Sequence, residues 1–443
     1  MITDRFIYPN GLLLTYDQMI RTVQQYVSTE RASSAKTPKT LAPVIERYLI
    51  NQRVETKRAL SDIAVDMAED MSGTSFLSKY LNHLDDYPTL EEININAWNS
   101  IVLRYTDRQD EWLDESFRDP QHALDTINKL LSRSHSKRLT ATTPGVVSYI
   151  VDLEGVRNTA MCEPVIPRDA GVYASIRIVR PNVVTGENIL SEQELAPDML
   201  ELLRLFVKYR ISTAISGEKG AGKTSILNYL LSLIDRNYRI GIIEEGGREL
   251  SLRRFDKNGR LINQVLSLLT HPSSDPEENY DASRLLELCL RFDLEYLVPQ
   301  EMRSAEAYGA QEAARTGTAV FSSLHCNNAD GTYPRIVTLC QKASRELSSV
   351  LLGYAVEAFP IAVYMQKMPD GNRRCLEIVE ADGTDGGKLL THPLFRYLIE
   401  DNKENDGNIQ TIGHFEQVGH LSDRLRDRML YRGASKTQLQ KFL

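Results

Sequence analysis

A glycine-rich segment between two apolar runs has the spacing of a phosphate-binding loop. It reads Gly217-Glu-Lys-Gly-Ala-Gly-Lys-Thr224 and matches the pattern G-x-x-x-x-G-K-[ST]. The β-branched run 211–216 before it predicts a buried strand, and the apolar spacing of 225–234 after it predicts a helix. Because the pattern acts in this strand–turn–helix context, the segment is predicted to bind a nucleotide.

Each position of this loop has a chemical role. The glycines let backbone N–H groups turn toward phosphate oxygens, and the start of the following helix adds partial positive charge. Lys223 reaches the β- and γ-phosphates, and Thr224 offers a hydroxyl to Mg²⁺. With ATP and Mg²⁺ as the expected cofactors, the predicted binding set is Gly217, Gly220, Ala221, Gly222, Lys223, Thr224 and Ser225.

Three apolar runs downstream of the loop end in charged or polar side chains. The residues at these ends are Glu244 and Glu245, then Glu301 and Arg303, then Ser323 and His325. Because ligands of α/β sheets bind at the carboxyl ends of the strands, these side chains are expected near the nucleotide.

The order of these motifs resembles the secretion ATPase superfamily, the hexameric motors of type II secretion, type IV secretion and type IV or tight-adherence pili. The resemblance covers roughly residues 216–328 and is most similar to the tight-adherence pilus and conjugative type IV branch. Its four parts are the phosphate loop, an acidic box ending in Glu249-Leu250, an atypical Walker B stretch with Glu301, Arg303 and Glu306, and a histidine box with His325 and Asn327. The zinc-binding insert with four cysteines of some members is absent, so no zinc is expected.

The chain departs from the family motifs at a few positions while keeping their principal charges. The substituted residues are Gly246 for the Asp of the acidic box, Leu294, Glu295 and Gln300 for the Pro, Asp and Gly of the Walker B stretch, and Thr318 and Ser323 for the first His and the Thr of the histidine box.

The resemblance implies roles for the strand-end residues. Glu245 is expected to orient the attacking water, and Glu244 takes this role if the register differs by one. Glu301 is expected to hold Mg²⁺ together with Thr224, because a hard cation prefers oxygen ligands. His325 is expected to sense the γ-phosphate or to bridge subunits, although a lone histidine is more often structural.

Arginines are expected to complete the site. In the resembled family, arginines from the end of the N-terminal domain reach phosphates held by the other domain, some across a subunit boundary. Guanidinium suits this task because it stays charged and binds phosphate in a bidentate way. The matching residues are Arg157, Arg177 and Arg180, and Arg303 either acts similarly or holds Glu301. The alternative is that they are ordinary sheet-surface arginines in salt bridges.

The pattern of apolar residues predicts an α/β protein with two domains. Alternating strand and helix texture after the linker indicates parallel βαβ units, and the resemblance implies a RecA-like P-loop NTPase domain that forms rings. The expected parts are a polar N-terminal segment (1–40), an α+β domain (41–180), a linker (181–195), the ATPase domain (196–401) and a polar, helical C-terminal tail (402–443). A hairpin is predicted over 87–105, and the greasy stretch 350–364 is predicted as a core helix running into a strand.

Composition narrows the class of protein. The chain has 443 residues, of which 42% are hydrophobic and 25% charged, as in ordinary globular proteins. Five cysteines without a C-x-x-C pair make a disulfide framework unexpected and favour a reducing compartment. A net charge of −8 gives no global attraction for nucleic acid. No signal peptide or membrane span is indicated, so a cytoplasmic protein is expected, held at the inner membrane face by partners.

We therefore hypothesise an ATP-hydrolysing motor for protein export or pilus assembly. It would act as a homo-oligomer, with six subunits implied by the resemblance, on an inner-membrane platform protein, without direct bilayer insertion. Two alternatives are a RecA-like motor acting on nucleic acid and a nucleotide-sensing assembly subunit without catalysis. The substituted acidic and histidine boxes motivate the second alternative, and the retained Lys223, Thr224, Glu245 and Glu301 oppose it.

Overall fold

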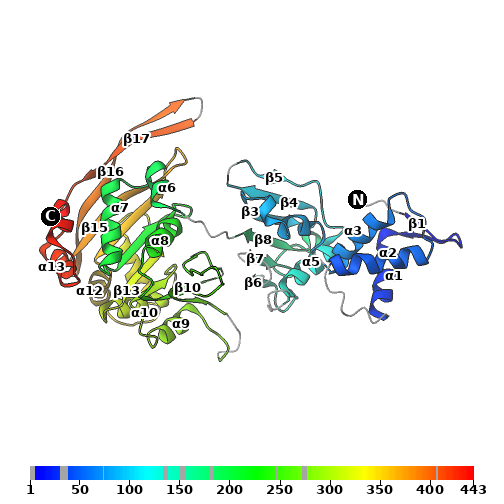
Figure 1. Cartoon of the computed structure of the whole chain (residues 1–443), viewed down its shortest axis with the longest axis horizontal. Helices are drawn as coiled ribbons and strands as arrows, with labels where there is room; N and C mark the ends of the chain where they lie inside the picture. Colours follow the sequence, from blue (N-terminus) through cyan, green and yellow to red (C-terminus); the bar gives the residue numbers. More distant parts are fainter. Residues whose placement is uncertain are drawn as a thin grey trace. The chain divides into compact units, whose positions relative to one another are not determined.

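The structure is a computed structural model that describes residues 5–29, 38–72, 74–106, 108–132, 138–149, 156–178, 184–245, 247–271, 277–405 and 408–443. The chain divides into two compact units, Met1–Arg180 and Pro181–Leu443. Figure 1 labels their elements, and each unit is described by itself. Among the helices of the described residues, none combines the length and apolar character that crossing a bilayer requires.

The N-terminal unit begins with a small helical cluster. The elements are β1 (Arg5–Ile7), β2 (Leu13–Thr15), α1 (Tyr16–Thr29), α2 (Pro38–Asn51) and α3 (Leu60–Ser72). Helix α1 lies where the sequence predicted only a polar segment over 1–40. It forms because Met19, Ile20 and Val23 share one helical face and are buried with residues of α2 and α3, such as Ile45 and Ile63.

A six-stranded antiparallel sheet follows in the same unit. Its strand order is β5-β4-β3-β8-β7-β6. The elements are α4 (Ser78–Leu81), β3 (Leu90–Ala97), β4 (Ser100–Tyr105), β5 (Glu111–Trp112), α5 (Pro120–Ser132), β6 (Gly145–Tyr149), β7 (Val156–Met161) and β8 (Tyr173–Ile178). The predicted hairpin is confirmed as the β3·β4 pair. Helix α5 buries Ile127, Leu130 and Leu131 in one core with the sheet residues.

The C-terminal unit starts inside the segment that the sequence predicted as a linker. Helix α6 (Gly186–Ser191) begins with a capping box between Thr185 and Asn188. Ile189 and Leu195 are buried in the core of this unit. Residues 186–195 are therefore part of the folded unit, because their apolar side chains pack into it.

A nine-stranded sheet is the centre of the C-terminal unit. Its order is β11-β10-β12-β13-β9-β14-β15-β16-β17. The first six of these strands pair in parallel, as the alternating texture predicts. The strands of this part are β9 (Thr213–Gly217), β10 (Arg239–Glu244), β11 (Gln264–Leu269), β12 (Tyr296–Pro299), β13 (Ala319–Leu324) and β14 (Ile361–Lys367). Strand β13 lies between β9 and β12, although it follows both in the chain.

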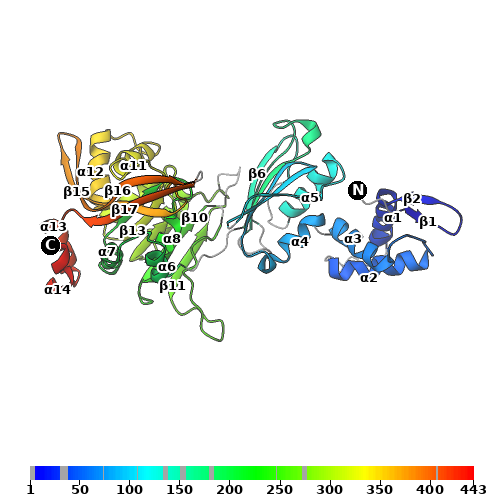
Figure 2. The same cartoon turned by 90° about the horizontal axis from the view of Figure 1, so that it is seen from above.

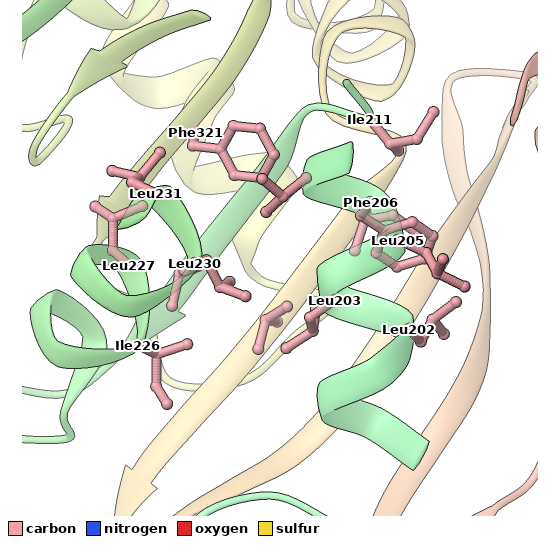
Figure 3. Close-up of a cluster of buried hydrophobic side chains, with 14 of the residues drawn as sticks. Leu202, Leu203, Leu205, Phe206, Ile211, Ile226, Leu227, Leu230, Leu231 and Phe321 are labelled. Carbon is pink, nitrogen blue, oxygen red and sulfur yellow. The ribbon is translucent and has the colours of Figure 1, made fainter. Parts of the chain in front are cut away.

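Helices cover both faces of this sheet (Figure 2). They are α7 (Pro197–Lys208), α8 (Lys223–Ser232), α9 (Ala282–Cys289), α10 (Glu306–Arg315), α11 (Thr332–Cys340) and α12 (Ser348–Ala358). Leucines of α7 and α8 pack with Phe321 of β13 on one face, as Figure 3 shows. Residues of α9 to α12 share a second core with Val320 and Leu324 on the other face. Strands buried on both faces read as continuous apolar runs, which is why the sequence pattern predicted them.

The C-terminal part of the chain corrects a second prediction. Strands β15 (Arg373–Asp385), β16 (Lys388–Asn405) and β17 (Asn408–Gln417) extend the sheet in an antiparallel manner. The region 402–443 is therefore not a helical tail throughout. Helices α13 (Asp423–Tyr431) and α14 (Lys436–Leu439) follow only after β17, and Leu425, Met429 and Phe442 are buried in the main core.

Candidate functional site

The glycine-rich loop joins β9 to α8 at the carboxyl end of the parallel strands. Gly222 caps α8 with a φ of +86°, a left-handed conformation that suits glycine. Gly217 lies so close to β14 that a Cβ would come within 2.1 Å of the Met365 carbonyl oxygen. The first N–H groups of a helix have no partner inside the helix, so this end of α8 suits an anion. The other loop and first-turn positions are Gly220, Ala221, Thr224 and Ser225.

Lys223 is folded back into the loop, with only 7% of the residue exposed. Its Nζ donates to the carbonyl oxygens of Gly217 at 2.9 Å and Glu218 at 2.8 Å. It also lies 3.3 Å from Nδ1 of His325. Burial lowers the pKa of Lys223, and the nearby carboxylate of Glu301 opposes that shift. The lysine cation is thus held inside the loop, where a bound phosphate would compete with two carbonyl groups for it.

His325 joins the loop to the end of β12. Its Nδ1 lies 3.2 Å from the Gly217 carbonyl oxygen, and its Nε2 lies 3.2 Å from Oε1 of Glu301. This is possible because β13, which ends just before His325, lies between β9 and β12. The residue after the middle strand therefore reaches both neighbours.

Glu301 is the most connected acidic group of the site. It extends β12 through a bridge to Ser323, and its Oε2 accepts a hydrogen bond from Nη2 of Arg303 at 2.6 Å. Burial alone would raise the pKa of Glu301, but the hydrogen bond and charge of Arg303, with His325 and Lys223, lower it. The group therefore stays a carboxylate next to the loop.

Glu245 belongs to the same group of charges, but Glu244 does not. Nη1 of Arg303 lies 3.7 Å from Oε2 of Glu245, and both residues line a small pocket with Glu301 and Glu306. Burial and the charge of Glu306 raise the pKa of Glu245. A carboxyl group with a raised pKa beside a second carboxylate is suited to handling a proton.

Glu244 points into the protein. The residue has no exposed surface, and its Oε1 accepts a hydrogen bond from the Leu250 N–H at 2.9 Å. Its Oε2 has no partner among the described residues. Burial raises the pKa of Glu244 to about 7, although hydrogen bonds from Leu250 and Glu249 N–H groups oppose this. Because it faces away from solvent, the geometry favours Glu245 over Glu244 as the residue that meets water.

Two substituted motif positions take part in fixing this edge of the sheet. Nε2 of Gln300 donates to Oε2 of Glu249 at 2.7 Å, which ties the acidic box to β12. The hydroxyl of Ser323 donates to the Gln300 carbonyl oxygen at 2.8 Å. Oε1 of Glu306 accepts from the N–H groups of Arg303 and Ser304 at 2.5 and 2.6 Å. These bonds hold the backbone on both sides of Glu301.

The oxygen atoms near the loop suit a magnesium ion. Oε1 of Glu301 is buried and accepts no hydrogen bond from the described residues apart from its contact with His325. The Thr224 hydroxyl lies on the first turn of α8, where a P-loop protein places a metal ligand. Within the described ranges, three or more His, Cys, Asp or Glu side chains do not gather as a metal site. Any Mg²⁺ here would therefore depend on nucleotide and water oxygens for most of its ligands.

The predicted N-terminal arginines fall on neighbouring strands. Arg157 of β7 lies directly opposite Arg177 of β8 in the antiparallel register, and both are half-buried. Like charges opposite each other destabilise a sheet, so this pair suits an anionic ligand. On its other side Arg177 lies opposite Glu92 of β3. Arg180 lies outside the described residues.

Sequence reasoning assigned no role to two residues beside the loop. Nε of Arg373 donates to the Gly220 carbonyl oxygen at 3.1 Å. A Cβ on Gly222 would lie 2.9 Å from Cδ of Arg373 and 3.7 Å from Oε1 of Glu194. Burial raises the pKa of Glu194 to about 7, and the charge of Arg373 opposes that shift. The Pro369-Asp-Gly-Asn372 turn was a signal that β15 returns along β14 toward the loop, but no local pattern indicates Glu194.

Comparison with known proteins agrees with this arrangement. Residues 150–358 match the family model described as type II/IV secretion system protein. This part of the chain belongs to that family. The resemblance to secretion ATPases drawn from the four motifs is thereby confirmed, and the family segment contains every described residue of the loop and the strand-end cluster.

Relatives of this family domain come from secretion and motility systems. An uncharacterized protein of Bacillus anthracis is 23% identical over 63% of this chain and 59% of its own length. A twitching motility protein of Neisseria gonorrhoeae is 26% identical, over 53% of this chain and 56% of its own. The type IV secretion system protein VirB11 of Brucella suis is 23% identical, over 52% and 61%. The match thus spans less than two thirds of the length of each of these relatives.

A solved structure is similar at a lower level. The pilus retraction motor PilT with bound ADP aligns with 83% of this chain and 87% of its own, at 16% identity and a TM-score of 0.48.

Proposed function

We propose that the chain is a Mg²⁺-dependent ATPase that supplies mechanical work to a machine for protein export or pilus assembly. One observation supports this most strongly. An unbroken line of contacts runs from the Lys223 ammonium through His325 to Glu301, Arg303 and Glu245. The phosphate loop and the residues suited to activating water therefore form one cluster.

Each side chain has a role in this proposal. Loop N–H groups and Lys223 bind the β- and γ-phosphates, while Thr224 and Glu301 hold the Mg²⁺ ion, which neutralises charge on the phosphate oxygens. Glu245 orients the attacking water, and Arg303 keeps the carboxylates of Glu245 and Glu301 in place. When a phosphate takes Lys223 from the Gly217 and Glu218 carbonyl groups, His325 loses its neighbour and reports the occupancy of the loop.

The division of labour between the two units belongs to the same proposal. Residues 196–401 form a RecA-like ATPase domain, and the N-terminal unit contributes Arg157, Arg177 and Arg180 to phosphates. The functional form is a ring, with six subunits as the resemblance implies, and a membrane platform protein receives the work. The family membership of residues 150–358 and the secretion and motility relatives support this placement.

Phosphate release by the purified full chain tests the proposal. Wild-type protein with Mg²⁺ and ATP is expected to release phosphate, and the Lys223→Ala variant is expected to release none above background. Nucleotide binding without release by the wild type would support a nucleotide-sensing assembly subunit instead. Equal rates for wild type and Lys223→Ala would contradict the phosphate-loop assignment.

A further inference from the structure

The last two strands of the large sheet continue beyond its body as a two-stranded ribbon (Figure 1). Strand β15 pairs with β16 only as far as Arg396, whereas β16 and β17 remain paired up to Asn405 and Asn408. We call residues 397–405 and 408–417 the arm. Strand β17 is the edge of the sheet in the described part of the chain, so one side of the arm has an unpaired row of backbone groups.

The surface of the arm combines acidic and apolar side chains. Ile399 is 48% exposed and Ile409 is 41% exposed, and Leu398 is exposed beside them. Its acidic residues are Glu400, Asp401, Glu404 and Glu416, against the single lysine Lys403. A two-stranded ribbon alone is at best marginally stable in water. The exposed apolar groups and the open edge therefore indicate a surface that is covered in the working protein.

A basic hairpin precedes β11, the strand at the opposite edge of the same sheet. We call residues 253–262 the basic hairpin; its two sides meet at a bridge between Phe255 and Leu261. Phe255 is 50% exposed and Ile262 is 44% exposed. The basic residues are Arg253, Arg254, Lys257 and Arg260. The one acidic residue, Asp256, is engaged in the turn, where its Oδ1 accepts from the N–H groups of Asn258 and Arg260.

We propose that the arm of one copy of this chain docks on the basic hairpin of a second copy. The two surfaces have opposite charge, and each presents exposed apolar side chains at its centre. They cannot meet within one chain, because eight strand spacings of about 4.8 Å separate β17 from β11. Joining opposite ends of one sheet is a head-to-tail contact, which repeats from copy to copy and gives a ring when the rotation closes.

This contact shares the homo-oligomer with the proposed function but needs no ATP hydrolysis. Both surfaces lie in the C-terminal unit, and neither contains a residue assigned to phosphate, metal or water. Assembly and hydrolysis can therefore fail separately in experiment.

Charge reversal tests the contact. The arm variant carries Glu404→Lys and Glu416→Lys, and the hairpin variant carries Lys257→Glu and Arg260→Glu. Sedimentation of the full chain is measured with Mg²⁺ and a non-hydrolysable ATP analogue, and without them, at low and high salt. Each variant alone is expected to associate at least about tenfold more weakly than wild type, because like charges then face each other. High salt is expected to weaken wild-type association as well.

Mixing the two variants gives the decisive result. The acidic arm of the hairpin variant matches the basic hairpin of the arm variant, and the two reversed surfaces match each other. The mixture is therefore expected to assemble although neither component does. Glu287→Lys with Glu346→Lys, two exposed acidic residues outside both surfaces, serves as a matched control that should associate like wild type. A wild type that is monomeric under both nucleotide conditions, or reversal variants that assemble normally, would overturn the proposal.

Discussion

The imidazole of His325 lies 3.2 Å from the Glu301 carboxylate through Nε2, while its Nδ1 lies 3.2 Å from the Gly217 carbonyl oxygen. A neutral imidazole has one N–H and can donate to only one of these oxygens, whereas the protonated ring donates to both. The ring therefore couples the phosphate loop to the strand-end acid, and this coupling leads to the first prediction.

Glu301→Gln is expected to bind ATP with nearly wild-type affinity while its turnover falls by about 10²- to 10⁴-fold. The amide keeps the size of the side chain but loses the charge that attracts Mg²⁺ and pairs with Arg303 and His325. Binding of a fluorescent ATP analogue and single-turnover phosphate release measure the two effects separately. Glu287→Gln, on the exposed face of α9, is the control and should hydrolyse normally. An unchanged rate for Glu301→Gln would remove Glu301 from the proposed mechanism.

Lys223→Ala is expected to weaken ATP binding by about 10- to 100-fold, the size of a lost charged hydrogen bond. The exposed Lys219 in the same loop supplies the control, since Lys219→Ala changes the net charge equally without touching the Gly217 and Glu218 carbonyl groups. Titration with the fluorescent analogue compares the two variants. Equal losses would mean that general charge, and not the position of Lys223, governs affinity.

Glu244 should make the folded protein less stable as pH rises. Its pKa is raised from 4.5 to about 7 by burial, so the native state favours the protonated form more than the unfolded state does. No penalty exists below about pH 4.5, and the penalty grows until the pH passes about 7. At 1.36 kcal/mol per pKa unit, the full effect is roughly 3 kcal/mol.

The Glu244→Gln variant isolates this effect, because the amide remains neutral at every pH and its oxygen can still accept from Leu250. Urea unfolding followed by circular dichroism is compared between wild type and variant at pH 5 and pH 8. The variant is expected to gain stability relative to wild type at the higher pH. A difference independent of pH would contradict a protonated native carboxyl group.

Arg177 is predicted to act on a nucleotide held by another copy of the chain. Arg177→Ala and Lys223→Ala are each expected to be inactive, whereas their mixture should recover part of the activity, since some interfaces then contain both Arg177 and Lys223. If Arg177 acts within its own chain, the mixture stays inactive. Phosphate release across a range of mixing ratios distinguishes the two outcomes, and Arg157→Ala in place of Arg177→Ala tests the opposite residue on β7.

The sequence determined the parts of this protein that depend on local pattern. The glycine spacing predicted the loop between β9 and α8, and continuous apolar runs predicted the buried strands that end near Glu245, Glu301 and His325. These predictions succeed because a strand covered on both faces must be apolar throughout, and a phosphate loop needs glycine at set positions.

Only the tertiary structure decided which strand ends are neighbours and where the sheet stops. The insertion of β13 between β9 and β12 brings His325 to both Gly217 and Glu301, and the return of β15 brings Arg373 to Gly220. Residues 402–417 were predicted as a tail because both sides of the arm face solvent, so its strands lack an alternating pattern. Their strand conformation comes from long-range pairing between β16 and β17, which no local window of sequence contains.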